Sequence, residues 1–326
     1  MKYRRLGSTG LRVSEIGFGA WGIGGVANGA VGYGPTDDRQ SCAALRRAFE
    51  LGVTFYDTAD IYGFGHSEEL IGAALTPVRS RIVIATKVGF LEPDGPQDFS
   101  PRHIRDSLEA SLRRLRTDYV DLYQLHNPPT DHLVKDPEIL DSLSDLRRQG
   151  KVRAIGVSVR SPEDALVAIR RLGFSAVQVN FSMVDQRARA NGLLALCAQE
   201  DVGVICRTPL CYGFLSGEYS PDRKFDASDH RARWPMEQLA RWAEAPGLFA
   251  EAVVRTNETP AQTALRFCLS YPSIATAIPG MLTVAQVDEN IGASALGPLP
   301  DAALAAVEAV YQSHEFFVGK AFTPTG

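Results

Sequence analysis

Short apolar runs alternate with amphipathic segments along almost the whole chain, and this alternation predicts the architecture. The apolar runs are mostly continuous, which is typical of parallel strands that are buried on both faces. The segments between them carry apolar residues at three- and four-residue spacing, as helices with one buried face do. The strands expected from this pattern are 15–21, 53–56, 82–86, 119–125, 152–157, 176–181, 202–206 and 274–278.

Each expected strand is followed by a segment with helical periodicity. The clearest helix starts are Ser100-Pro101 and Ser161-Pro162, because serine caps a helix and proline suits its first turn. We also expect Ser67 to cap the helix that contains HSEELIGAAL. The remaining expected helices are 37–51, 136–149, 188–200, 259–270, 283–293 and 300–312, with an irregular tail at 313–326.

Eight strands that each lead into a helix predict an α/β fold, the (α/β)8 TIM barrel. No linker or change in composition divides the chain, so we expect one domain over residues 1–326. Turn signals within residues 2–15 predict an N-terminal β-hairpin. The segment 211–235 is too long for a plain connection, so we expect a functional loop there, followed by extra C-terminal helices.

Composition and charge narrow the class of protein. The chain has 326 residues, is 45% hydrophobic and 22% charged, and carries a formal net charge of −4. Because acidic and basic residues are interspersed, we expect neither nucleic acid nor a membrane surface as a partner. The opening MKYRRLGSTG lacks the apolar core of a signal peptide, and five cysteines show no CxxC spacing. We therefore expect a cytoplasmic protein with reduced thiols.

Four polar groups stand just past the ends of three consecutive predicted strands. Asp57 ends the first of these strands, and Tyr62 follows five residues later. Lys87 and His126 end the next two strands. Alone, each is a common turn, cap or solvated side chain, but in a barrel all strand ends open on one face. Together they suit carbonyl reduction, in which Tyr62 protonates the alkoxide and Lys87 makes the phenol a stronger acid. Asp57 would hold the lysine, and His126 would orient the carbonyl.

A glycine-rich stretch offers a competing interpretation. The segment 17–22 satisfies G-x-G-x-x-G, which in a Rossmann unit opens a helix and precedes a ribose-binding acid. Here it runs into residues 22–29, which have no helical pattern, and Asp37 and Asp38 begin a helix instead of ending a second strand. We expect a glycine-rich loop at the mouth of the first strand.

Several motifs together resemble the aldo-keto reductase superfamily over nearly the whole chain. They are YRRLGSTGLRVSEIGFGAW, DTADIYG, SEELIGAAL, the TK strand end and LYQLHNPP. The resemblance implies an NAD(P)H-dependent oxidoreductase that reduces an aldehyde or ketone, or oxidises an alcohol or sugar. It identifies Asp57, Tyr62, Lys87 and His126 as the catalytic tetrad, with Tyr62 as general acid. It further implies a small-molecule carbonyl or sugar substrate and NADP(H) as the preferred cofactor, with NAD(H) possible.

The resemblance also implies a set of cofactor contacts. Ser158 is kept at a position that binds the nicotinamide carboxamide, whereas Val159 stands where the family usually has asparagine. Arg207 replaces an aromatic ring that stacks on the nicotinamide, and a planar guanidinium can stack too. The segment 213–217 resembles the loop over the pyrophosphate, and Thr283 with Gln286 forms a capping-box pattern beside a 2′-phosphate site. The implied cofactor residues are Ser158, Gln178, Arg207, Pro209, Leu210, Gly213, Leu215, Ser216, Gly280, Thr283, Gln286, Glu289 and Asn290.

Aromatic residues at loop ends are candidates for the substrate pocket. Trp21 and Phe90 are the first choice, and further candidates are Trp234, Phe316, Phe317 and Phe322. Two other functions stay open. One is a cofactor-sensing binding protein on the same fold, as in the potassium-channel β subunits that resemble this family. The other is a metal-dependent barrel hydrolase, although His126-Asn127-Pro128 lacks a His-x-His pattern and the other histidines lack ligand spacing, so we expect no metal.

Overall fold

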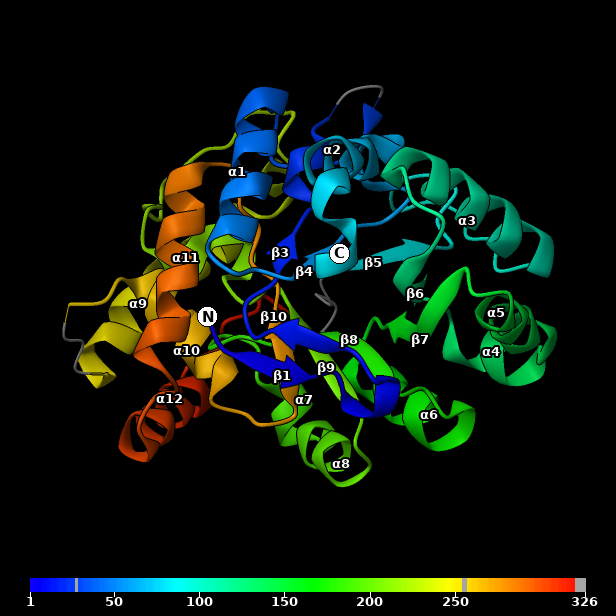
Figure 1. Cartoon of the computed structure of the whole chain (residues 1–326). Helices are drawn as coiled ribbons and strands as arrows, with labels where there is room; N and C mark the ends of the chain where they lie inside the picture. The colour runs from blue at the N-terminus through cyan, green and yellow to red at the C-terminus, as the bar shows by residue number, and fades with distance from the viewer. Residues whose placement is uncertain (27–28, 254–256, 320–326) are drawn as a thin grey trace.

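The computed structural model describes residues 1–26, 29–253 and 257–319. Eight parallel strands form one curled sheet inside a ring of helices (Figure 1). Their order in the sheet follows their order in the chain. The strands are β3 (Phe18–Gly19), β4 (Phe55–Asp57), β5 (Val83–Val88), β6 (Val120–His126), β7 (Val152–Ser158), β8 (Ala176–Asn180), β9 (Gly203–Arg207) and β10 (Ile274–Ala277).

The sheet closes on itself along a seam between β3 and β10. Across this seam the Gly17 amide donates to the Ala277 carbonyl (2.8 Å), and the Gly19 amide donates to the Pro279 carbonyl (3.0 Å). A Cβ on Gly19 would lie 2.7 Å from the Ile278 carbonyl oxygen, so a side chain there would force the two ends apart. The predicted (α/β)8 barrel is therefore confirmed.

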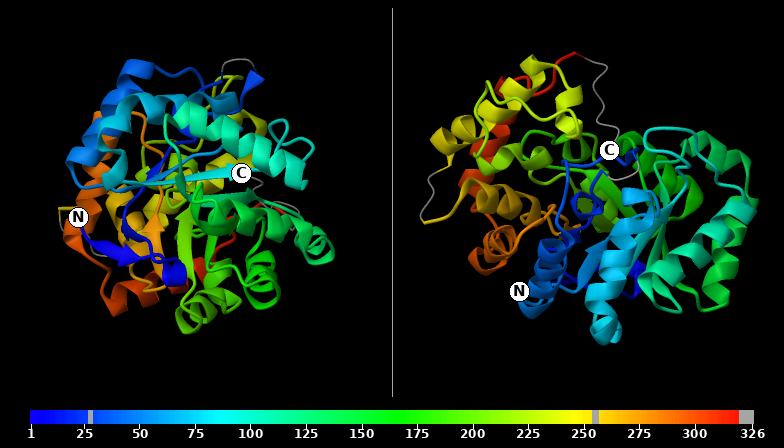
Figure 2. Two further views of the ribbon diagram at one scale, coloured as in Figure 1. Left: turned by 45° about the vertical axis from the view of Figure 1, so that its right-hand side comes forward. Right: turned by 90° about the horizontal axis from the view of Figure 1, so that it is seen from above.

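Helices surround the strands, as the two further views in Figure 2 show. Ser100 and Ser161 cap their helices as predicted, since their hydroxyls accept from the amides of His103 and Asp164. The helices are α1 (Asp38–Glu50), α2 (His66–Leu75), α3 (Pro101–Leu115), α4 (Thr130–Lys135), α5 (Glu138–Arg148), α6 (Pro162–Leu172), α7 (Arg187–Ala190), α8 (Leu193–Gln199), α9 (Met236–Ala252), α10 (Pro260–Leu269), α11 (Val284–Leu296) and α12 (Asp301–Ser313).

Two of the predicted helix boundaries are wrong. Ser67 is not the cap of α2, because the helix begins at His66 with Gly65 in the left-handed region before it. The Ser67 hydroxyl instead donates to the Ala20 carbonyl (2.8 Å) and so ties α2 to the loop after β3. The single helix predicted at 188–200 is two, because Gly192 adopts φ +84° between α7 and α8.

The predicted N-terminal hairpin is formed by β1 (Tyr3–Arg5) and β2 (Arg12–Ser14), and it covers the end of the barrel where the strands begin (Figure 1). Its Leu6 and Val13 pack inside the barrel against Phe55, Leu122 and other apolar residues that point inward. This end of the lumen is therefore sealed and apolar. Polar chemistry is left for the opposite end, where the strands finish.

The segment 211–235 is irregular, as expected, and carries two short turns of 3-10 helix, Cys211–Ser216 and His230–Arg233. The extra helix predicted after it is α9, and α12 packs against it. Phe316 stacks on Phe249 of α9, which places it in the packing of these helices. Phe322 and the rest of 320–326 lie outside the described residues. All five cysteines are free thiols.

Candidate active site

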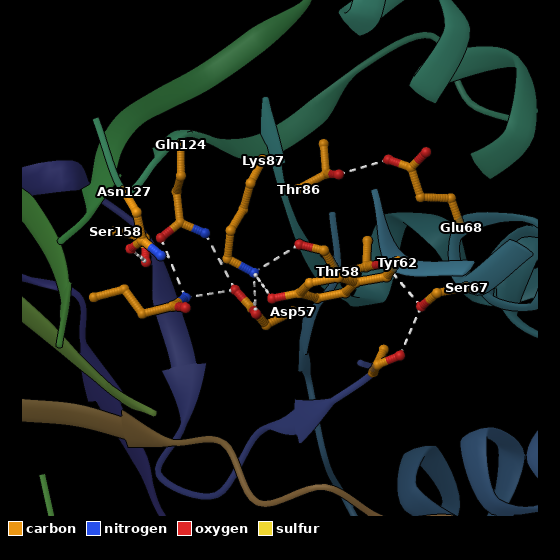
Figure 3. Close-up of polar contacts among 12 residues, drawn as sticks. Asp57, Thr58, Tyr62, Ser67, Glu68, Thr86, Lys87, Gln124, Asn127 and Ser158 are labelled. Carbon is orange, nitrogen blue, oxygen red and sulfur yellow. Dashed lines mark hydrogen bonds and ion pairs between the residues drawn. The ribbon is translucent and has the colours of Figure 1, made fainter. Parts of the chain in front are cut away.

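Lys87 is the centre of the polar group at the strand ends. Its side chain is fully buried, and its ammonium donates to Asp57 Oδ1 (2.5 Å) and to the Thr58 carbonyl (2.8 Å). A third bond goes to the Tyr62 hydroxyl oxygen (3.1 Å), as Figure 3 shows. An ammonium has three protons to donate, so each of them has an acceptor here. Three of the four groups predicted to converge are thus joined by direct hydrogen bonds.

Charge at this site is set by the pair of Lys87 and Asp57. Burial alone would lower the pKa of Lys87, but the attraction of Asp57 outweighs it, and the pKa lies above its ordinary value. The lysine therefore stays charged across the range in which enzymes work. A fixed cation 3.1 Å from the Tyr62 oxygen would stabilise a phenolate at that position.

His126 ends β6 and is 3% exposed. Its ring lies edge-on to the ring of Tyr62, with 5.8 Å between centroids, and to Phe90 at 4.9 Å. Burial, followed by the charges of Lys87 and Arg207, holds its pKa well below the ordinary range. The imidazole is therefore neutral near pH 7 and keeps one N–H to donate.

Local backbone geometry explains why Tyr62 is followed by Gly-Phe-Gly. Gly63 adopts φ +61°, and a Cβ there would lie 2.3 Å from the Gly24 carbonyl oxygen. Phe64 also adopts a positive φ, +52°, which non-glycine residues rarely do. The turn wedges the Tyr62 segment against the loop after β3, so the glycine-rich stretch serves as a close-packed support for the tyrosine.

Asp57 receives two further hydrogen bonds on its second oxygen. Gln178 donates its amide N–H to Asp57 Oδ2 at 2.7 Å, and Gln124 donates to the same atom at 3.1 Å. Gln178 was expected at the nicotinamide carboxamide, whereas Gln124 is absent from the predicted site. Gln124 lies inside a strand instead of at its end, and the pattern of strand ends therefore did not reveal it.

A cavity of about 230 Å³ opens beside these groups and extends from Tyr62 to α11. Many of the predicted residues line it, together with Tyr33, Tyr219 and Arg231, which were not predicted. The predicted residues on its wall are Trp21, Asp57, Tyr62, Gln178, Arg207, Pro209, Leu210, Gly213, Gly280 and Gln286. Phe90 and His126 are not among the residues that line this cavity; their rings contact each other, with 4.9 Å between centroids.

Other predicted residues lie behind the wall of the cavity. Ser158 is fully buried and donates to Asn127 Oδ1 (3.0 Å), and the Ser216 hydroxyl donates to the Gly213 carbonyl (2.8 Å). Leu215 faces a separate small cavity beside Met183. These three residues support the site from behind, and direct cofactor contacts by them stay a prediction.

The start of α11 differs in detail from the expected capping box. The Thr283 hydroxyl accepts from the Gln286 amide (3.3 Å), as predicted. The Gln286 side chain, however, accepts from the Leu282 amide (2.8 Å), one residue before the cap, so the pairing is not reciprocal. Glu289 is half-buried and Asn290 is 3% exposed, and both lie further along the helix.

Arg207 ends β9 and reaches into the cavity. It is 8% exposed, and its Nη2 donates to the Val159 carbonyl (2.9 Å), which fixes the guanidinium near Tyr62 and His126. Burial lowers its pKa, but arginine keeps its charge in proteins. The cavity therefore has a fixed cation at the end where Tyr62 and Asp57 lie.

Two chain segments meet over the cavity, and we call them together the strap: residues 29–36 and 226–234. The His230 amide donates to the Gly32 carbonyl (2.9 Å), and Tyr33 forms a bridge with Asp229. Arg231 donates to both carboxylate oxygens of Asp229 and to the Tyr219 hydroxyl (2.9 Å). The length of the insertion predicted a functional loop here, but no motif marked these residues.

Two features of the described parts of the chain bear on metal binding and on membrane spanning: the grouping of possible metal ligands and the length of apolar helices. Within those parts, no three His, Cys, Asp or Glu residues are grouped so that they could hold a metal ion. None of the helices described there combines the length and the apolar surface that crossing a bilayer requires.

The barrel and its polar strand ends define the class of protein. A profile of the Aldo/keto reductase family matches residues 15–312, which is most of the chain, so the chain belongs to the aldo/keto reductase family. It is an oxidoreductase of a family that uses nicotinamide cofactors and acts on small-molecule carbonyl compounds.

Individual relatives agree with this assignment. The chain is 32% identical over 298 residues to probable aldo-keto reductase 1 of Glycine max, covering 90% of this chain and 84% of that protein. It is 32% identical over 293 residues to the Schizosaccharomyces pombe aldo-keto reductase yakc, whose name carries NADP(+), with 86% and 84% covered.

A solved aldo-keto reductase of Bacillus halodurans has the same architecture. Its holo form matches with a TM-score of 0.79 at 28% identity, and the match covers 98% of this chain and 99% of that one. The apo form of the same protein gives a TM-score of 0.70. The present fold is thus more similar to the cofactor-bound form of that protein.

Proposed function

We propose that this protein reduces an aldehyde or ketone with NAD(P)H, and that Tyr62 is the general acid. The observation that carries the proposal is the lysine that bridges Asp57 and Tyr62 beside the cavity. A carboxylate that holds an ammonium against a phenol is an arrangement for proton transfer. The neutral imidazole of His126 adds a donor for the carbonyl oxygen.

Each residue has a distinct part in the proposed reaction. When bound, the reduced nicotinamide supplies a hydride to the carbonyl carbon. Tyr62 transfers its hydroxyl proton to the carbonyl oxygen, which forms the alcohol, and Lys87 stabilises the phenolate left behind. Asp57 keeps Lys87 charged and in place. His126 donates a hydrogen bond that orients the carbonyl before transfer.

The extent of the cavity supports a dinucleotide, because its wall runs from Tyr62 and Arg207 to Gln286 at the start of α11. Between the two ends of the cavity its wall includes Tyr212 and Gly213, in a turn where Cys211, Tyr212 and Gly213 all adopt positive φ. The start of α11 lies at the far end, where a helix N-terminus favours an anion. Cys211 and Tyr212 were not among the predicted contacts, because no side-chain pattern announces such a turn.

We propose that the nicotinamide lies at the Tyr62 end of the cavity and the adenine at α11. Arg207 would lie against the nicotinamide ring or bind an anionic group of the substrate. We propose NADP(H) as the preferred cofactor with NAD(H) possible, supported by the NADP(+) in the name of yakc. The remaining contacts are proposed for Ser158, Gln178, Pro209, Leu210, Gly213, Leu215, Ser216, Gly280, Thr283, Gln286, Glu289 and Asn290.

Replacing Tyr62 by phenylalanine tests the proposal. Tyr62→Phe removes only the acidic proton, so kcat should fall about 10²–10⁴-fold while the Kd for NADPH stays nearly constant. The assay is NADPH oxidation with a panel of aldehydes, ketones and sugars. Tyr123→Phe is the matched control, because its hydroxyl donates to the Ile104 carbonyl (3.0 Å) in the core. A Tyr62→Phe enzyme with near-normal kcat would refute the assigned role.

The binding-protein alternative makes a different prediction for the unmodified chain. A cofactor sensor binds NADPH tightly but oxidises it negligibly with every carbonyl compound offered. Turnover that depends on Tyr62 would exclude that alternative. The hydrogen bonds that join Asp57, Lys87 and Tyr62 favour an enzyme over a sensor. Binding a cofactor does not require a proton donor that is held by an ammonium group.

A further inference from the structure

The Asp57 carboxylate is held from two sides. It is 2% exposed, and Lys87 occupies one oxygen while two glutamine amides occupy the other. Figure 3 shows Gln124 aimed at Asp57 from the side opposite Tyr62. Gln124 is fully buried and Gln178 is 1% exposed. Such a saturated carboxylate is fixed in orientation, because turning it would break several charge-assisted bonds.

The position of Gln124 follows from the barrel geometry. Side chains at i and i+2 of a strand point to the same face, and Leu122 packs inside the lumen. Gln124 therefore points inward one layer above Leu122, and Asp57 and Gln178 stand in the same relation to Phe55 and Ala176. The three polar residues come from the alternate strands β4, β6 and β8, as layers of a barrel core do. They form a polar layer on top of an apolar one.

Glycine on the neighbouring strand makes room for this glutamine. Gly156 of β7 pairs in register with Gln124, and a Cβ on Gly156 would lie 3.3 Å from Gln124 Cγ. The same Cβ would lie 3.2 Å from the Ala176 carbonyl oxygen. The strand pattern alone gives no reason for a glycine at 156. The close approach of Gln124, together with the Ala176 carbonyl oxygen and Leu122 Cδ1 (3.2 Å), supplies one.

The hydrogen bonds of the polar layer determine which end of each glutamine amide faces Asp57. A carboxylate only accepts, so both glutamines must turn their NH₂ groups towards Asp57. Gln178 also donates to Gln124 Oε1 (3.3 Å), and this bond reinforces the direction that Asp57 imposes on the Gln178 amide. The Gln178 carbonyl oxygen is then the end left to accept from an N–H group, such as that of a carboxamide.

We propose that Gln124 is a positioning residue for the proton-transfer step. It locks Asp57 so that Lys87 faces Tyr62, and together with Asp57 it orients Gln178 towards the cofactor end. This inference rests on the proposed function of the site. The charged and titratable groups around the layer are Lys87 and Arg207, which interact with Asp57, and Tyr62 and His126, which lie near Lys87.

Gln124→Met tests the proposal by removing the donor at similar volume. A hydrogen bond to a charged group is of a size that corresponds to a fall in kcat of roughly 10–100-fold. The matched control is Gln238→Met, a fully buried glutamine on α9 that donates to the Phe316 carbonyl (2.8 Å) and leaves the site untouched. Equal kcat values for the two variants would overturn the inference.

Gln124→Glu distinguishes positioning from mere packing, and it remains informative if the methionine variant does not fold. The introduced carboxyl group can donate to Asp57 when it is protonated, as the amide does, whereas its ionised form repels Asp57. The ratio of kcat for Q124E to kcat for the unmodified enzyme should therefore rise as the pH is lowered, and the ratio for Q124M should not. A pH-independent ratio for Q124E would also overturn the inference.

The two proposals fail in different ways. If Tyr62→Phe retains its kcat, the proposed function is wrong whatever Gln124 does. If Tyr62→Phe is inactive and both Gln124 variants behave like the unmodified enzyme, only the role of Gln124 is lost. The thermal midpoints of all variants show whether a loss of kcat reflects unfolding.

Discussion

Asp60, two residues before Tyr62, carries a carboxyl group that the proposed mechanism does not use. Its Oδ1 is buried and makes no hydrogen bond with any of the described residues. Burial, reinforced by the charge of Glu68 and opposed by Arg114, raises the pKa of Asp60 to about 8. At pH 7 this carboxyl is therefore mostly protonated, so the segment leading to Tyr62 holds a neutral acid.

Asp60→Asn should change how stability depends on pH. The folded carboxyl keeps its proton up to a pKa of about 8, whereas an unfolded aspartate loses it near 3.9. Between these values the folded state binds more protons, so the free energy of unfolding of the unmodified protein falls as pH rises. In denaturant titrations, the free energy of unfolding of the Asp60→Asn variant minus that of the unmodified protein should therefore increase from pH 5 to pH 8. Asp131→Asn, at an exposed position, is the control, and an equal difference at both pH values would contradict the assignment.

The residues at the site were predictable to different degrees. Asp57, Lys87 and His126 were visible because they end strands, and strand ends of a barrel share one face. Gln124 contacts Asp57 directly but lies inside β6, and its inward direction follows from Leu122, which packs in the lumen two residues earlier on the same strand. Tyr33 and Arg231 come from irregular segments, where no periodicity relates sequence to position.

At the scale of elements, the short 3-10 helix His230–Arg233 contains two arginines, one buried and one exposed. The Arg231 side chain is 9% exposed and is paired with Asp229, whose side chain is 7% exposed. The Arg233 side chain is 60% exposed and forms an ion pair with Asp94 (3.4 Å), which is exposed as well. One residue anchors the strap from within, while the other lies on its outer face.

Arg231→Ala should destabilise the strap far more than Arg233→Ala. Removing one partner of a buried ion pair typically costs about 3–5 kcal/mol, because the other charge is left uncompensated. An exposed pair contributes about 0–1 kcal/mol. Because Arg231 lines the cavity, the Kd for NADPH should also rise in Arg231→Ala only. Isothermal titration and urea unfolding measure both effects, and similar values for the two variants would rule out an anchoring role.

The predicted elements succeeded where local chemistry decides their ends. Ser100 and Ser161 cap helices because proline follows and the strand before them has finished. Ser67 is followed by Glu68 and not by proline, and Gly65 in the left-handed region starts α2 earlier, which leaves the serine to contact the loop after β3. At that point tertiary packing overrides the local helix propensity. The contact lies far away in the sequence, so a short window around Ser67 does not include it.

At the scale of the whole molecule, we propose that residues 1–326 form one domain and that the protein is cytoplasmic. The barrel was predictable because its strands are continuous apolar runs and its helices are amphipathic throughout. The closure of the sheet between β3 and β10 was not predictable, because β3 has only two residues and its partners lie more than 250 positions away in the sequence.

The charge distribution along the chain bears on cofactor choice. No lysine or arginine occurs between Ser273 and Lys320, so α11 presents no basic side chain of its own to a 2′-phosphate. An exposed helix terminus contributes about 0.3–1 kcal/mol, whereas an arginine bond adds roughly 1.5–3 kcal/mol. We expect NADPH to be favoured over NADH in kcat/KM by no more than roughly a hundredfold.

The measurement is the ratio of the two kcat/KM values at one saturating carbonyl concentration. A ratio above about a thousandfold would mean that a basic residue from another element closes on the phosphate. Arg231 of the strap lies on the cavity wall and is the first residue to test in that event. Its bonds to Asp229 argue against such a role.

The seam of the barrel has a consequence for how the protein is made. Gly19, from the beginning of the chain, and Ile278 to Gly280, from near its end, together form part of the cavity wall. A nascent chain released from the ribosome before these residues would have the Lys87–Tyr62 pair but no complete cavity around it. We therefore expect that a chain ending before Ile278 cannot complete the cavity, and that cofactor binding requires segments from both ends of the chain.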